Sequence, residues 1–163
     1  MNNSSGSDPQ RELLRHALAT LAYRGGKAVR NAPENLSTFR ASDGVRTPGR
    51  ILTHIGDLMD WALTIAMGRR EWTDSKPLPW VQEVDRFFAA VKKLDDYLAS
   101  SEPLHTLPEK LLQGPIADAF THVGQIVMLR RMAGAPVRSE SYYEAEILPG
   151  RVGPDQVQPK REF

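Results

Sequence analysis

The chain has 163 residues, 40% of them hydrophobic and 25% charged, and this composition is typical of a single globular domain with a sizeable core. Lysine and arginine number 21 against 20 acidic residues. The net charge of +1 therefore argues against a nucleic-acid-binding protein, which would carry a concentrated basic face. The lack of cysteine excludes disulfides, thiolate metal ligands and a cysteine nucleophile.

Two cap signals that contain proline predict the first two helices. Asp8 followed by Pro9 predicts a helix start, because aspartate caps a helix and proline suits the first helical position. Apolar residues recur at helical spacing beyond Pro9, although Gly25-Gly26 interrupts their pattern. Thr47-Pro48 repeats the cap signal after a connection at residues 31–46. The stripe of the second helix ends near Gly68 and consists of Ile51, Ile55, Leu58, Ala62 and Ile65.

Two further helices follow a second connection at residues 71–79. The spacing of apolar residues predicts a third helix from Trp80 to Leu98. A fourth begins at Pro108 or at Pro115, since Gly114-Pro115 marks either a start or a kink, and it ends at Gly134. No strand-like alternation is comparably strong. The sequence therefore predicts one all-α domain, 1–163, in which residues 8–136 form a four-helix bundle.

The C-terminal residues, about 137–163, have a different pattern. Prolines and glycines break this segment at Pro149-Gly150, Gly153-Pro154 and Pro159. Its apolar side chains, among them Tyr142 and Tyr143, are too many for a purely solvated tail. We expect an irregular arm that packs across the bundle or onto a partner subunit.

Membrane and export signals are missing from the sequence. No segment approaches the roughly 18 consecutive apolar residues of a membrane span. The polar residues 1–8 lack the apolar core of a signal peptide. We therefore expect a cytoplasmic protein that does not bind membranes.

Three side chains that can bind metal are placed on two of the predicted helices. Asp118 and His122 are four residues apart, so they lie one above the other on one face of the fourth helix. His54 lies on the second helix, at or near its buried face. Two imidazoles and one carboxylate suit a divalent transition metal such as Zn, Ni, Mn or Fe, with open positions left for water. Gln125 and Thr121 are close enough in sequence to orient these ligands, although Gln125 could equally be an ordinary interhelical hydrogen-bonding group.

Each of these residues also has an ordinary structural interpretation. A single histidine on an apolar face is more often a core residue than a ligand. Asp118 could be a first-turn carboxylate that interacts with the helix dipole. His16 and His105 are better explained as surface or loop residues. Trp61 is more simply core packing than a substrate wall.

The chain resembles the DinB/YfiT-like superfamily of metal-dependent proteins over residues 8–136. The resemblance rests on His54 in the second helix and on the pattern H-x-G-Q-I-x-x-L-R-R-x-x-G of His122–Gly134. It implies a bundle with up-down-down-up connectivity and a metal held by three histidines, one on the second helix and two on the fourth. His54 and His122 match two of these, whereas Asp118 stands where the pattern has histidine. The substitution implies either a His-Asp-His site that prefers harder ions or a bundle that has lost its metal.

Two functions follow from this resemblance as expectations. The first is a metal-dependent transferase or hydrolase that activates water or an external low-molecular-weight thiol. The second is a non-catalytic bundle that acts in dimerisation or partner binding. Relatives of this kind are often homodimers, so a homodimer is expected in either case.

Overall fold

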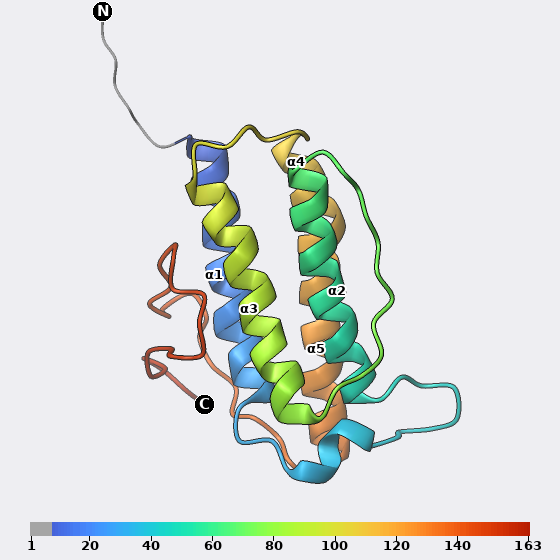
Figure 1. Ribbon diagram of the computed structural model, residues 1–163. Helices are drawn as coiled ribbons and strands as arrows, with labels where there is room; N and C mark the ends of the chain where they lie inside the picture. Colours follow the sequence, from blue (N-terminus) through green and yellow to red (C-terminus); the bar gives the residue numbers. More distant parts are fainter. Residues whose placement is uncertain (1–7) are drawn as a thin grey trace, which may run out of the picture.

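The computed structural model describes residues 8–163, and these residues form a helical bundle with an irregular C-terminal arm (Figure 1). Within this range no strand forms, and β structure is limited to a single antiparallel bridge between Glu140 and Glu162. The all-α expectation is confirmed. The long helices are α1 (Pro9–Val29), α2 (Pro48–Ala66), α3 (Trp80–Ala99) and α5 (Ala117–Met132), and the short ones are η1 (Glu34–Thr38), α4 (Pro108–Leu111) and η2 (Leu112–Ile116). None of the helices in the described range is long and apolar enough to cross a membrane.

The predicted caps begin the first two long helices. The Asp8 side chain accepts a hydrogen bond from the Gln10 N–H at 2.9 Å, and Thr47 Oγ1 accepts one from the Arg50 N–H at 3.4 Å. Both caps are followed by proline in the first helical position. These contacts fix where α1 and α2 start, and the start of α2 in turn fixes the position of His54 in its second turn.

The pair Gly25-Gly26 does not interrupt α1, contrary to what the apolar pattern indicates. The helix continues to Val29 because the glycines make room for a neighbouring helix. A Cβ atom on Gly25 would lie only 2.6 Å from Cζ of Phe87 in α3. The loss of helix propensity at glycine, about 1 kcal/mol, is offset by the close packing of the fully buried Phe87 ring.

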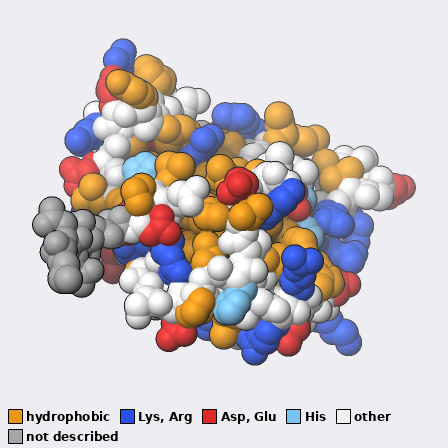
Figure 2. All heavy atoms as spheres, turned by 90° about the horizontal axis from the view of Figure 1, so that it is seen from above, with side chains coloured by type: hydrophobic (Ala, Val, Ile, Leu, Met, Phe, Trp, Pro, Cys, Tyr) orange, Lys and Arg blue, Asp and Glu red, His pale blue; other side chains and the backbone are white. Residues whose placement is uncertain are grey.

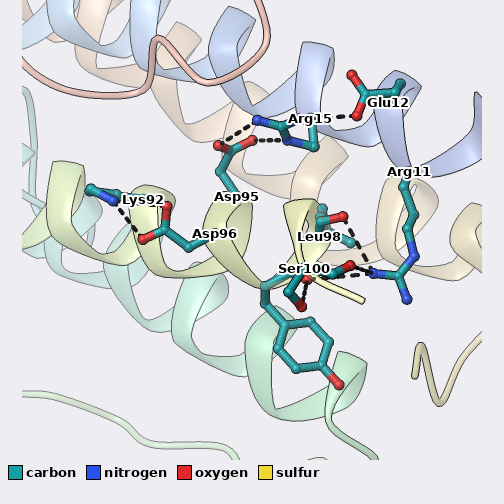
Figure 3. Close-up of polar contacts among 9 residues, drawn as sticks. Arg11, Glu12, Arg15, Lys92, Asp95, Asp96, Leu98 and Ser100 are labelled. Carbon is teal, nitrogen blue, oxygen red and sulfur yellow. Dashed lines mark hydrogen bonds and ion pairs between the residues drawn. The ribbon is translucent and has the colours of Figure 1, made fainter. Parts of the chain in front are cut away.

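Arginines on α1 hold it against α3 (Figure 3). Arg15 donates two hydrogen bonds to the two carboxylate oxygens of the buried Asp95, at 3.0 and 3.3 Å. Arg11 donates to the carbonyl oxygens of Leu98 and Ser100 at 3.3 and 3.2 Å. A guanidinium at this position satisfies carbonyls at the negative end of the α3 dipole.

The fourth helical segment both begins at Pro108 and kinks at Pro115, so the two alternatives raised by the sequence are combined. The segment starts as α4, passes through a π-helical stretch, η2, and continues as α5. Gly114 has non-helical backbone angles (φ −93°, ψ −106°), and Pro115 cannot donate a backbone hydrogen bond. Because α5 starts directly after the kink, Asp118 lies in its first turn.

The C-terminal arm packs on the bundle of its own chain, beside α1 (Figure 1). Lys27 of α1 donates to Glu140 at 2.7 Å and to Glu162 at 2.9 Å. Tyr23 of α1 donates a short hydrogen bond to Glu140, and its ring meets Tyr142 edge to face at 6.3 Å between centroids. The arm is therefore attached by polar and aromatic contacts, and the first of its two expected arrangements is observed.

Candidate metal centre

The three predicted ligands meet between α2 and α5. Asp118 Oδ1 lies 3.3 Å from His122 Nε2, one turn further along α5, and Asp118 Oδ2 lies 3.8 Å from His54 Nε2 across the interface with α2. The two imidazole rings face each other edge to face, with centroids 4.7 Å apart. One ligand atom from each residue lies within 4.8 Å of the others, so the group could hold a metal ion.

The two separations from the Asp118 carboxylate are close to what a tetrahedral ion needs. Zinc takes nitrogen and oxygen ligands at about 2.0–2.2 Å, which separates two ligand atoms by roughly 3.4 Å. The separations of 3.3 and 3.8 Å lie close to that value, and all three ligand atoms lie within 4.8 Å of one another. Two neutral imidazoles and one carboxylate are also a suitable donor set for a divalent transition metal.

Burial differs among the three side chains. His122 is 12% exposed and His54 is 22% exposed, whereas Asp118 is 48% exposed. The imidazoles thus form the inner wall of the site and the carboxylate lies at its mouth. Asp118 also lies in the first turn of α5, so its interaction with the helix dipole and its approach to both imidazoles occur together.

Two polar residues of α5 support the ligands, as their spacing suggested. Gln125 Oε1 lies 2.8 Å from His122 Nδ1. When this nitrogen carries the proton and donates to Gln125, Nε2 is unprotonated and points at Asp118, which is the tautomer that binds metal. The Thr121 hydroxyl donates to the Asp118 carbonyl at 2.6 Å and lies 3.4 Å from its Oδ1.

The environment of His54 favours its neutral form. Burial lowers the pKa of His54 below its ordinary value of 6.5, and the nearby His122 and Arg46 lower it further. Asp118 and Asp57 act in the opposite direction without reversing the shift. His54 is therefore uncharged near neutral pH, the state in which its ring nitrogen can bind a cation.

Trp72 belongs to the site, although its sequence context did not indicate this. Its ring meets His54 edge to face at 5.6 Å and Trp61 at 5.7 Å. Trp61 is partly buried and packs against the core, as expected, and it also lines the hollow beside Asp118. No signal in the sequence places Trp72, because it lies in the irregular connection at residues 67–79 and its position depends on how that segment docks.

Two buried carboxylates dock this connection onto the bundle. Asp57 of α2 accepts a hydrogen bond from the Ser75 N–H at 3.0 Å, and Glu83 of α3 accepts one from the Leu78 N–H at 2.7 Å. Both carboxylates are 1% exposed, and Arg86 lies between them, donating a short hydrogen bond to Asp57. By holding the connection, this network keeps Trp72 against His54.

The remaining two histidines lie apart from the centre, as expected. His16 is exposed on α1. His105 lies in the connection between α3 and α4, where its backbone N–H donates to the Ala66 carbonyl at 3.0 Å and its ring packs against Gly68. Neither belongs to the group formed by His54, Asp118 and His122.

Comparisons of the chain with protein-family models, with curated proteins and with solved structures find no match. Membership of the DinB/YfiT-like superfamily therefore stays a prediction that rests on His54 and on the pattern of His122–Gly134. The chemistry of the centre has to be inferred from its own residues.

Proposed function

We propose that the protein is a metal-dependent enzyme whose ion is held by His54, Asp118 and His122. The observation that carries this proposal is the meeting of three ligand atoms, from two helices, within 4.8 Å of one another. The hydrogen-bonding distance between His122 and Gln125 supports it, because a ligand histidine usually donates its second ring N–H to a fixed acceptor.

The donor set indicates the class of ion and of chemistry. Zn, Ni, Mn and Fe accept imidazole and carboxylate together, and replacing one imidazole with Asp118 favours the harder of these ions. The bound ion would lower the pKa of a water or thiol and prepare it as a nucleophile. Because the chain has no cysteine, such a thiol must come from a small-molecule cosubstrate.

The residues around the centre have defined roles in this proposal. Gln125 orients the His122 ring, while Trp72 and Trp61 shield one side of the site from water. The exposure of Asp118 leaves the site open to a substrate. The reaction is accordingly a transfer or hydrolysis at a small electrophile.

Membership of the DinB/YfiT-like superfamily is part of the same proposal. The up-down-down-up connectivity of that superfamily requires a long connection between successive helices that run in the same direction. Residues 67–79 form a long connection that runs back along the bundle from the end of α2 to the start of α3 (Figure 1). Such a connection allows α2 and α3 to run in the same direction, which supports this connectivity. A homodimer is also expected on this basis.

Catalysis can be tested with the metal-loaded protein, a small thiol and an aryl halide, and separately with an aryl ester as a substrate for hydrolysis. We expect turnover that a chelator abolishes and that added metal restores. His122→Ala should lose this turnover, whereas the control His16→Ala, which alters a histidine on the α1 surface, should keep it. Turnover that is the same in His122→Ala, or in chelator, would contradict the proposal.

A non-catalytic role in dimerisation is the second candidate, and exposed apolar side chains favour it. Figure 2 shows apolar side chains gathered across the end of the bundle at which α4 lies. Leu107 and Leu112, which flank α4, are 59% and 40% exposed, and Tyr143 of the arm is 99% exposed. This role predicts a dimer that forms equally in chelator and shows no turnover, which sedimentation measurements with and without chelator would detect.

A further inference from the structure

A hollow beside His54 is lined by positive side chains that pair with no carboxylate in the part of the chain that the structure describes. It has a volume of about 570 Å³, and Arg46, Arg50 and Lys76 contribute to its wall. Within residues 8–163, none of these three side chains forms an ion pair. Unpaired arginines in a concave surface attract oxyanions and can bind them through two parallel hydrogen bonds.

The acidic residues of this hollow do not cancel its positive charge. Asp57 lies in its wall, but this carboxylate is already bound by Arg86 and by the Ser75 N–H and is 1% exposed. Asp74 is the other carboxylate of the lining. Three positive side chains therefore face one uncompensated negative side chain, and the hollow favours an anion.

A second hollow, on the His122 side of the centre, is apolar. It has a volume of about 430 Å³ and is lined mainly by Val45, Ile51, Met128 and Leu129, together with His122 and Gln125. Val45 and Met128 are 38% and 53% exposed, so a ligand could cover apolar surface there. Arg46 lines both hollows, so the two lie next to each other.

We propose that the substrate is a small organic anion with an apolar body. Its oxyanion binds to Arg46 and Arg50, and its apolar part occupies the hollow formed by Val45, Met128 and Leu129. A molecule that spans both hollows passes His54 and His122, so its central bond lies beside the metal centre. That this anion is a substrate rests on the proposed function. The binding of the anion in the two hollows requires no metal.

Hexanoate is a suitable probe, because it combines a carboxylate with a short apolar chain. Its binding to the wild-type protein, metal-free and zinc-loaded, can be measured by calorimetry and compared with that of acetate and hexan-1-ol. We expect hexanoate to bind at least about tenfold more tightly than either comparator, because each of these fills only one hollow.

Variants test the two hollows separately. Arg50→Gln should weaken hexanoate binding about tenfold, whereas Arg40→Gln, an exposed arginine outside both hollows, should leave it unchanged. Met128→Ser should weaken hexanoate but not acetate. Equal binding by the Arg50→Gln and Arg40→Gln variants, or hexanoate binding no tighter than hexan-1-ol, would overturn the proposal.

Zinc content measured on the same samples separates this proposal from the proposed function. Binding of hexanoate with the expected variant effects, in a protein that takes up no zinc, would support the anion site and refute the metal centre. One bound zinc without preferential hexanoate binding would support the metal centre and refute the anion site.

Discussion

Gln125 follows His122 by one turn of α5, and its Oε1 atom lies 2.8 Å from Nδ1 of His122. Together with Asp118, these residues occupy positions i, i+4 and i+7, which share one face of a helix. The same face thus carries a carboxylate ligand, an imidazole ligand and the group that orients the imidazole. Only His54 has to be supplied by another helix, so the α2–α5 packing determines whether the centre is complete.

Removing Gln125 should weaken metal binding without unfolding the protein. In Gln125→Ala, His122 loses the acceptor that fixes its ring and tautomer, and we expect metal affinity to fall by roughly 10–100-fold. Competition with a fluorescent zinc chelator would measure the change. Gln82→Ala, at an exposed position of α3, is the matched control and should bind as the wild type does. Equal affinities in the two variants would refute the role given to Gln125.

Changing Asp118 to histidine should alter which metal is preferred. The variant would present three imidazoles, which favour zinc and nickel over manganese more strongly than the native set does. After incubation with equal zinc and manganese, elemental analysis should give a higher zinc-to-manganese ratio for Asp118→His than for the wild type. An unchanged ratio would mean that Asp118 does not bind the ion.

The sequence was sufficient for the starts of α1 and α2 and for the ends of α2 and α5, because the signals there are local. Asp8-Pro9 and Thr47-Pro48 form side-chain caps within their own helix turns, and Gly68 and Gly134 follow helix ends with positive φ. The glycine pair in α1 was misleading for a physical reason. A glycine that lowers helix propensity can also allow tight packing, and the Phe87 ring that requires this is far away in sequence.

The candidate site was predictable only in part. The i, i+4 spacing placed Asp118 and His122 together, and the pattern of the second helix placed His54 near its buried face. Trp72 could not be predicted, because its position depends on Asp57 and Glu83 hydrogen-bonding to the backbone of an irregular connection. Backbone amides have no sequence signature, so such a contact is visible only in the structure.

Breaking the anchor of this connection should destabilise the protein. Asp57→Ala removes one of the two buried carboxylates that pair with Arg86, together with the acceptor of the Ser75 N–H, and we expect a loss of about 3–5 kcal/mol in the free energy of unfolding. Asp60→Ala removes the exposed partner of the same arginine and should cost at most about 1 kcal/mol. Urea unfolding of both variants would measure the difference. Similar losses in the two would show that burial of Asp57 does not determine its contribution.

Acid should loosen the C-terminal arm. The hydrogen bond from Lys27 lowers the pKa of Glu162 below its ordinary value of 4.5, and the charges of Lys27 and Arg138 lower it further. A carboxyl group whose pKa is lower in the folded state stabilises that state fully above its unfolded pKa and loses this effect as the pH falls through its folded pKa. The stability difference between wild type and Glu162→Gln should therefore be present near pH 6 and shrink toward pH 3. Urea unfolding midpoints at these pH values would measure it, and a difference independent of pH would contradict this assignment.

Metal content tests the central claim most directly. Protein purified without a metal-affinity step can be analysed for bound elements, before and after incubation with zinc, nickel, manganese and iron. We expect about one divalent ion per chain in the wild type and in the control His16→Ala, and much less in His122→Ala and Asp118→Ala. A wild-type protein that binds none of these ions, or a His122→Ala variant that binds as much as the wild type with its fold intact, would contradict the assignment of His54, Asp118 and His122 as a metal centre.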